Sequence, residues 1–159
     1  MIIAVSGTPG TGKTEAARAL AGLLGWKLVA LNDLASRKGL YSGYDRERKC
    51  KIVDISSIAR EVEKLSGENN SMIVESHYAH DMPCDVAVIL RTRPDELRKR
   101  LVKKRWLHRK IEENVEAEIM EICKSEALEQ GRKVIEIDTT GKRPGQTAEE
   151  IARKTRQLI

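Results

Sequence analysis

A glycine-rich stretch near the start of the chain has the residue types and spacing that bind a chain of phosphates. Residues 7–14 read Gly-Thr-Pro-Gly-Thr-Gly-Lys-Thr and fit the pattern G-x-x-x-x-G-K-[ST]. Gly7 and Gly12 are its fixed glycines, and without a Cβ they let backbone N–H groups approach phosphate oxygens. Lys13 offers a positive charge to the β- and γ-phosphates, and the Thr14 hydroxyl is a ligand for Mg²⁺. These residues predict a site for a nucleoside triphosphate with its Mg²⁺.

The motif needs a strand before it and a helix after it, and the sequence supplies both. Residues 2–5 form an apolar run rich in β-branched side chains, and residues 15–20 have a helical pattern that stops at Gly25. The helix adds its positive N-terminal end to the same anion-binding site. A glycine-rich turn that binds nothing is the alternative, and this context argues against it.

A second candidate lies at the end of the next apolar strand, residues 72–75. The strand ends in Glu75, which is the pattern of a carboxylate that holds Mg²⁺ directly or through water. His77 follows two residues later, so in an extended chain it points to the same side and can orient a water or an acceptor near the γ-phosphate. The alternatives are an ordinary strand-end acid and a surface histidine. The neighbouring phosphate loop favours function for both, whereas His80 has no such support.

Positive charge is concentrated in one segment. The chain carries +5 overall, but residues 91–110 contain ten Lys and Arg against two acids, which gives +8 there and −3 elsewhere. Such a run is a solvated helix face, a lid whose arginines clamp phosphates, or a surface for RNA. Arg105 and Arg109 are the best lid candidates because they flank a short break between two predicted helices. Aromatic residues are too few for a platform that stacks single-stranded RNA bases.

The remaining patterns predict alternating strands and helices. Strands are expected at residues 27–31, 85–90 and 133–137, and helices at 34–38, 58–65, 94–105 and 111–130. A capping box, Thr147 with Glu150, is expected to open the last helix, and residues 40–45 are expected to be loop. The order implies a single α/β domain, residues 1–159, with a P-loop NTPase or kinase fold and about five parallel strands between helices. The site is expected where the phosphate loop, Glu75 and residues 138–145 converge.

Cysteine usage and the first residues favour a cytoplasmic protein. Three cysteines are scattered along the chain without a C-x-x-C pair, so neither a disulfide framework nor a zinc site is indicated. The chain passes directly into its first strand without a charged lead or a long apolar segment. We therefore expect neither secretion nor a membrane partner.

With these residues in hand, the sequence resembles the adenylate kinase isoenzyme 6 family, nucleotide kinase-like ATPases that assist maturation of the small ribosomal subunit. The resemblance runs nearly end to end. It rests on the phosphate loop, on L-Y-S-G-Y-D at 40–45 with Cys50 and Asp54 downstream, on E-S-H at 75–77, on L-R-T at 90–92, and on the lid-like stretch 105–114. The phosphate loop is common to many kinases, and the second and third motifs decide the choice.

The resemblance implies a broad-specificity nucleoside monophosphate (NMP) kinase, ATP + NMP to ADP + NDP, with ATPase activity. It also implies a role in ribosome biogenesis and rRNA processing and binding to a platform protein of the small ribosomal subunit. The basic charge of residues 91–110 leaves an rRNA contact through that segment open. It places the monophosphate in an insert at about 30–53 and a lid at about 104–114. The residues that it implies for ATP are Gly10, Gly12, Lys13, Thr14, Glu15 and Arg105, and those for the monophosphate are Asp33, Tyr41, Tyr44 and Asp45.

Two departures from the family pattern bear on activity. The strand-end acid is Glu75 where the family has Asp, and the lid has Trp106-Leu107 after Arg105 where the family has a glycine and an aromatic residue. The first departure puts the balance between kinase and ATPase in question. Two other functions therefore stay open: an ATP-driven assembly switch with incidental kinase activity, and a small-metabolite kinase of the shikimate or gluconate type.

Overall fold

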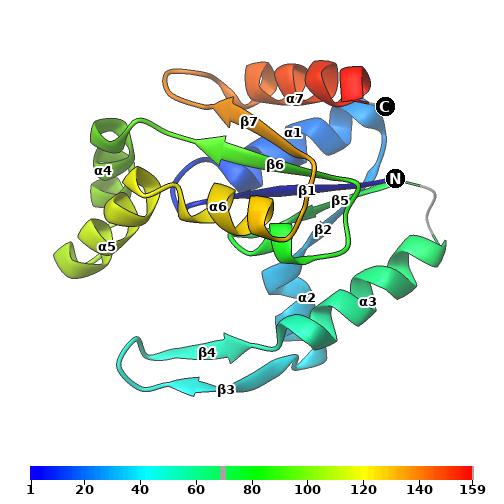
Figure 1. Ribbon diagram of the computed structural model, residues 1–159. Coiled ribbons are helices and arrows are strands. Elements are labelled where there is room, and N and C mark those ends of the chain that lie inside the picture. The colour runs from blue at the N-terminus through cyan, green and yellow to red at the C-terminus, as the bar shows by residue number, and fades with distance from the viewer. Residues whose placement is uncertain (69–70, 159) are drawn as a thin grey trace.

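The computed structural model describes residues 1–68 and 71–158, and its centre is a sheet of five parallel strands (Figure 1). The strand order is β2-β5-β1-β6-β7, so the two strands next to β1 come from distant parts of the chain. The strands are β1 (Ile2–Gly7), β2 (Lys27–Ala30), β5 (Met72–Glu75), β6 (Val86–Arg91) and β7 (Val134–Asp138). Their carboxyl ends share one edge of the sheet, which confirms the expected α/β fold.

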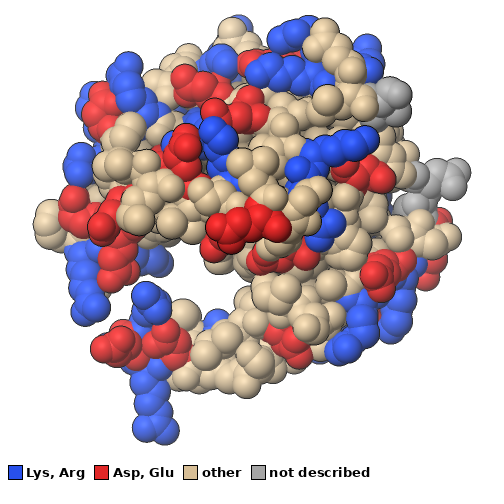
Figure 2. Space-filling view, viewed as in Figure 1, with Lys and Arg blue, Asp and Glu red and all other residues tan. Residues whose placement is uncertain are grey.

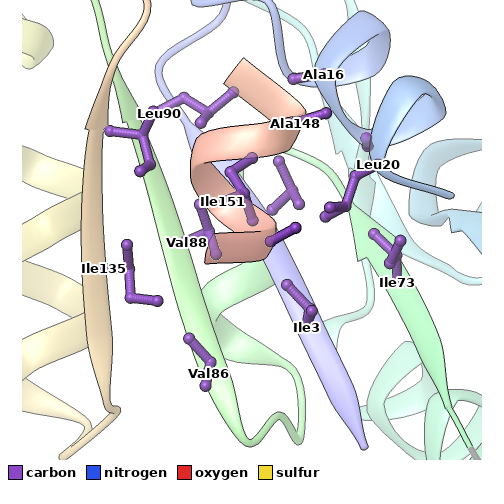
Figure 3. Packing of buried hydrophobic residues seen from close by; sticks show 14 residues of the cluster. Ile3, Ala16, Leu20, Ile73, Val86, Val88, Leu90, Ile135, Ala148 and Ile151 are labelled. Carbon is purple, nitrogen blue, oxygen red and sulfur yellow. The ribbon is translucent and has the colours of Figure 1, made fainter. Parts of the chain in front are cut away.

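Helices cover both faces of this sheet because side chains of the central strands alternate between two apolar clusters. Ile3 and Val5 of β1 face α1 (Lys13–Leu24) and α7 (Pro144–Leu158), where Leu20 and Ile151 complete the packing (Figure 3). Ala4 faces the other side. There the sheet is covered by α2 (Leu31–Lys38), α3 (Ile55–Glu68), the short 3₁₀ helix η1 (Ala79–Asp81) and α6 (Ile122–Glu129).

An antiparallel hairpin protrudes below the sheet in Figure 1 and corrects the prediction that residues 40–45 are loop. It consists of β3 (Tyr41–Asp45) and β4 (Cys50–Val53), and α2 and α3 flank it in the chain. Asp45 closes the turn by accepting a hydrogen bond from the Arg48 N–H at 3.0 Å. Within the described residues the two strands pair only with each other, and most of their side chains are exposed. Neither strand therefore needs one apolar face, and their sequence lacks the alternation of apolar and polar residues that marks a half-buried strand.

The predicted helix at 111–130 is two helices, α5 (His108–Ile119) and α6. Glu121 breaks them apart, since its φ of 55° is left-handed and cannot continue an α-helix. Each half packs on a different partner: α5 packs against α4 (Pro94–Lys103), whereas α6 packs against the sheet. The apolar repeat continues across the break, and for this reason it did not reveal the break.

The last helix and α3 begin earlier in the chain than the sequence predicts. The last helix begins at Pro144, and the Thr147 hydroxyl donates back to the Arg143 carbonyl at 3.4 Å, so no Thr147–Glu150 capping box forms. Helix α3 begins at Ile55 under an Asp54 cap, whose carboxylate accepts from the Ser57 N–H at 3.1 Å. Among the described residues, no helix is both long and apolar enough to cross a membrane.

Candidate active site

The phosphate loop lies between β1 and α1, and its backbone requires glycine at three places. Gly7, Gly10 and Gly12 have φ angles of 144°, 94° and 86°. A Cβ on Gly7 would lie 2.6 Å from the Leu90 carbonyl oxygen, and one on Gly10 would lie 2.8 Å from side-chain carbons of both Leu97 and Leu101. The loop therefore has its shape because β6 and α4 press against it from outside.

Lys13 is buried at the start of α1, with only 9% of its surface exposed. Its ammonium donates a hydrogen bond to the Thr8 carbonyl oxygen at 3.2 Å, within its own loop. Burial lowers the pKa of Lys13 to about 8, and the nearby Glu75 carboxylate opposes this shift. A phosphate oxygen is a stronger partner for this charge than a peptide carbonyl, so the site favours an anion here.

Thr14 and Glu75 lie side by side at the end of the sheet. The Thr14 hydroxyl donates to the Glu75 Oε1 at 3.4 Å, and in the strand register Glu75 is opposite Val5 on one side and Ala30 on the other. Burial raises the pKa of Glu75, whereas Lys13 and the Thr14 hydroxyl lower it. Hard oxygen donors beside a phosphate loop are what Mg²⁺ prefers, with phosphate and water completing its shell. The residues at this place fit a magnesium ion.

His77 follows a turn rather than an extended chain, which corrects the reasoning that placed it beside Glu75. The strand ends at Glu75, and the turn is held by the Tyr78 N–H on the Ser76 hydroxyl at 3.1 Å. His77 itself is exposed at the rim of the site. Its pKa is lowered, first because the protein around the ring displaces solvent and then because positive Lys13 is close. The imidazole is therefore neutral at neutral pH.

His80 anchors this turn from below. It is 1% exposed, its Nδ1 shares a hydrogen bond of 2.7 Å with the Ser6 hydroxyl, and its Nε2 lies 3.0 Å from a Glu126 carboxylate oxygen. A histidine held on both sides in the interior fixes backbone position.

The two lid candidates, Arg105 and Arg109, differ in whether their guanidinium groups already pair with an acid. Arg109 forms an ion pair with Glu113 at 3.2 Å on the helix surface. Arg105 has left-handed backbone (φ 56°), and within the described ranges its guanidinium has no ion pair. The turn after it is anchored by Trp106, whose ring packs against the apolar cluster between α4 and α5 and lies 3.8 Å from the Lys110 ammonium.

Much of the basic segment 91–110 is neutralised within the protein. Half of its ten basic residues pair with acids: Arg91, Arg93, Arg98, Arg100 and Arg109. Over the parts of the chain that the structure describes, the others form no ion pair: Lys99, Lys103, Lys104, Arg105 and Lys110. Figure 2 shows red and blue side chains mixed over the visible face. The surface open to a polyanion is therefore narrower than the charge of the segment implies.

Arg100 and Thr139 join the phosphate loop to the loop after β7, and sequence reasoning missed both. Arg100 donates to the Gly10 carbonyl at 3.4 Å and to the Thr139 carbonyl at 3.2 Å. The Thr139 hydroxyl donates to the Thr11 carbonyl at 3.0 Å. The expected convergence of residues 138–145 on the phosphate loop is thereby confirmed. In the sequence nothing distinguishes Arg100 from its basic neighbours.

Glu118 is the second residue that was missed. It is 2% exposed, and its Oε2 accepts a hydrogen bond of 2.6 Å from the Thr8 hydroxyl in the phosphate loop. Its Oε1 accepts from Arg91 at 2.6 Å and from the Thr92 N–H at 3.1 Å. A signal was present, because Glu118 continues the apolar stripe of Ile111 and Val115 on α5.

The residues expected to bind a monophosphate are spread along the hairpin side. Asp33 lies in the first turn of α2, and its negative charge raises the pKa of Glu75. Tyr41 packs at the base of the hairpin, with the Lys51 ammonium 4.8 Å from its ring. Tyr44 is 56% exposed further out, and Asp45 is occupied by Arg48 in the turn. Figure 2 shows an open notch between this arm and the side that carries α4 and α5.

The sheet, the glycine loop after its first strand and the helix that follows define a P-loop α/β protein. Solved structures with this fold include shikimate kinase from Acinetobacter baumannii in complex with shikimate (TM-score 0.70, 16% identity, 99% of this chain and 93% of that chain). Deoxyadenosine kinase from M. mycoides is similar (TM-score 0.67, 14% identity, 99% and 100% of the chains). At these identities the likeness shows the fold alone.

Sequence comparison then gives the family. A family model described as "AAA domain" matches residues 3–121. Relatives that carry the name "Putative adenylate kinase" are 40% identical in Thermococcus onnurineus and 42% identical in Pyrococcus furiosus, each over 95% of this chain and 82% of the relative. One from Methanosarcina mazei is 40% identical over 100% of this chain and 87% of the relative. The chain belongs to the family of these adenylate kinase-like proteins.

Proposed function

We propose that the chain is an NMP kinase that transfers the γ-phosphate of ATP to a nucleoside monophosphate, giving ADP and a nucleoside diphosphate. The observation that carries this proposal is the cluster of Lys13, Thr14 and Glu75 at the strand ends. The molecule also has an open notch between the hairpin and the side that carries α4 and α5 (Figure 2). The names of the 40%-identical relatives support the proposal. Two facing arms suit a reaction that must hold a donor and an acceptor and exclude water.

The donor side of this mechanism depends on positioning and charge. Backbone N–H groups of the loop around Gly10 and Gly12, with Glu15 at the start of α1, surround the phosphates. Lys13 neutralises charge on the transferring group. Thr14 and Glu75 would hold Mg²⁺, which supplies further neutralisation of the phosphate oxygens when it is bound.

The acceptor side uses the insert at about 30–53 and the lid at about 104–114. Asp33 lies at the base of the insert, in the first turn of α2, and its negative charge adds to the raised pKa of Glu75, which is due first to burial. Tyr41 lies at the base of the hairpin, Tyr44 lies further along the same strand, and Asp45 shapes its turn. Arg105 has no acid partner among the described residues, so its guanidinium is available to bridge donor and acceptor phosphates when the lid closes.

Two more specific properties, the range of acceptors and the hydrolysis of ATP, are proposed from the family resemblance and from His77. Broad acceptor specificity and ATP hydrolysis belong to the proposal, with neutral His77 orienting a water or the acceptor. A second function is a nucleotide-driven step in small ribosomal subunit maturation, through a platform protein in the cytoplasm. Lys99, Lys103 and Lys104, which form no ion pair within the described residues, favour contact with RNA in that step.

An assay with and without acceptor tests the kinase. ADP formation from ATP and Mg²⁺ should be faster with AMP than without it, and Lys13→Ala should abolish both rates. Equal rates with and without AMP would reject the NMP kinase and leave an ATPase. The same assay with shikimate, gluconate and the other nucleoside monophosphates as acceptors distinguishes an NMP kinase from a small-metabolite kinase.

A pull-down from cell extract with ATP or ADP tests the assembly function. Capture of a small-subunit ribosomal protein in one nucleotide state supports it, and capture in neither state counts against it. His77→Ala should reduce ATP hydrolysis more than ATP binding. A variant that loses both to the same degree would argue against a role for His77 in orienting water.

A further inference from the structure

Two helices of the lid side press on the outside of the phosphate loop. Leu97 and Leu101 of α4 lie where a Cβ on Gly10 would be only 2.8 Å from their methyl carbons. The same leucines pack with Ile111 and Val115, so α4 and α5 form one apolar unit. The shape of the loop therefore depends on where this helical unit sits.

Glu118 adds a polar tie between α5 and the same loop. One carboxylate oxygen accepts from Arg91 and the Thr92 N–H, and the other accepts a hydrogen bond of 2.6 Å from the Thr8 hydroxyl. A buried carboxylate needs such partners, because an unpaired oxygen in the interior costs free energy. Thr8 is 3% exposed, so water does not compete for this bond.

Thr8 is also the residue that holds Lys13. Its carbonyl oxygen accepts from the Lys13 ammonium at 3.2 Å, from the Thr11 hydroxyl at 2.8 Å and from the Thr11 N–H at 3.2 Å. Three of the loop's own bonds thus converge on one peptide group. Moving Thr8 moves the acceptor that positions the Lys13 side chain before phosphate arrives.

Helix α5 spans from this tie to the lid. It begins at His108, directly after Arg105 and Trp106, and it carries Glu118 in its last turn. A helix of 12 residues is a rigid rod of about 18 Å. One rigid element therefore contacts the phosphate loop at one end and the lid turn at the other.

We propose that Glu118 is a positioning residue that acts through Thr8: it holds the phosphate loop, and hence Lys13, in the shape that receives the γ-phosphate, and it ties that shape to the helix that carries the lid. The inference deepens the proposed kinase function and rests on it for its kinetic consequence. The competing explanation is that Glu118 serves only to neutralise Arg91.

The chain offers a matched control for that explanation. Glu121 also pairs with Arg91, at 2.6 Å, and within the described residues its exposed carboxylate forms no hydrogen bond to the phosphate loop. Thr8→Val removes the hydroxyl at constant shape, Thr8→Ser restores it, Glu118→Gln removes the charge, and Glu121→Gln takes one acid from Arg91 without touching Thr8. Unfolding curves first verify that all four variants are folded.

Hydrogen exchange of the nucleotide-free protein tests the tie without any activity. Thr8→Val should speed exchange of amides in residues 8–14 by about tenfold, the effect expected for loss of a bond to a charged group. Glu118→Gln should act on the same amides, and the double variant should add little to Thr8→Val. The proposal would be overturned if these amides exchanged at the wild-type rate in Thr8→Val. It would also be overturned if Glu121→Gln raised their exchange rate as much as Thr8→Val does.

Kinetics test whether the tie positions Lys13. In the AMP-dependent assay, kcat of Thr8→Val should fall about tenfold with an unchanged KM for AMP, Thr8→Ser should recover, and Glu121→Gln should match wild type. If Thr8→Val shows faster exchange but a normal kcat, Glu118 is structural and the proposal fails. If the wild type shows no AMP-dependent rate, the proposed function fails, and the exchange experiment still decides whether the tie exists.

Discussion

Replacing Lys13 by methionine should stabilise the nucleotide-free protein and abolish ATP binding. The ammonium is 9% exposed and is held by one peptide carbonyl, a weak partner for a full charge. Burial lowers the pKa of Lys13 from 10.5 to about 8 despite the opposing charge of Glu75. At pH 7 the group is still charged, in a place where the protein favours the neutral form.

The size of the effect follows from that shift. A pKa that is lower by about 2.5 units corresponds to about 3 kcal/mol of destabilisation wherever both folded and unfolded states are protonated. Because the folded pKa of Lys13 lies below the unfolded one, the unfolded chain binds more protons between about pH 8 and pH 10.5. The free energy of unfolding therefore rises with pH through this window, and Lys13→Met removes that rise.

Urea unfolding of wild type and Lys13→Met from pH 7 to pH 10 measures both quantities. The variant should be more stable by about 3 kcal/mol at pH 7, and the gap should narrow toward pH 10. Lys27→Met, at an exposed position on β2, is the control and should show no such dependence. A Lys13→Met protein that is no more stable at pH 7, or a gap that is constant with pH, would refute the reasoning. The confirming result would mean that the loop stores a cost that phosphate binding relieves.

Four further substitutions have outcomes that can be read from the geometry. Gly10→Ala should lower the free energy of unfolding in urea by about 2–5 kcal/mol, because the new Cβ strains the left-handed backbone and collides with the leucines of α4. Gly12→Ala should lower it by only about 1–2 kcal/mol, the backbone strain alone, because the nearest atom to its Cβ is 4.0 Å away. Asp54→Ala should cost about 1 kcal/mol by removing the cap of α3, measured in the same way. Glu75→Gln should weaken ATP binding with Mg²⁺ more than without it, measured by calorimetry, and equal weakening would argue against Glu75 as a metal residue.

The sheet was predictable from sequence because its central strands are buried on both faces. Residues 72–74 and 86–90 therefore form continuous apolar runs, which can be recognised without tertiary information. The hairpin at 41–53 was not predictable in this way. Within the described residues its two strands pair with each other and mostly face solvent. They therefore need no apolar face, and their composition resembles that of a loop.

The residues of the candidate site also differ in whether the sequence alone could identify them. Lys13, Thr14 and Glu75 sit in local motifs whose spacing carries their chemistry. Arg100 reaches Gly10 across 90 positions, and Glu118 reaches Thr8 across 110. Contacts of that separation depend on how α4 and α5 cross the loop, and this crossing is a product of packing rather than of any short pattern.

Glu118 nevertheless left a trace in the sequence that physical chemistry can interpret. An acid within an apolar helical stripe is tolerated only if it is paired, because a bare buried carboxylate costs several kcal/mol. Arg91 alone would satisfy one oxygen, and the structure gives that oxygen a second donor in the Thr92 N–H. The other oxygen turns to the phosphate loop and meets Thr8. Neutralising Arg91 would require only one of the two carboxylate oxygens, whereas holding the phosphate loop requires the second oxygen to bind Thr8. Thr8→Val removes only this second bond, and it is therefore a more decisive test than an Arg91 variant.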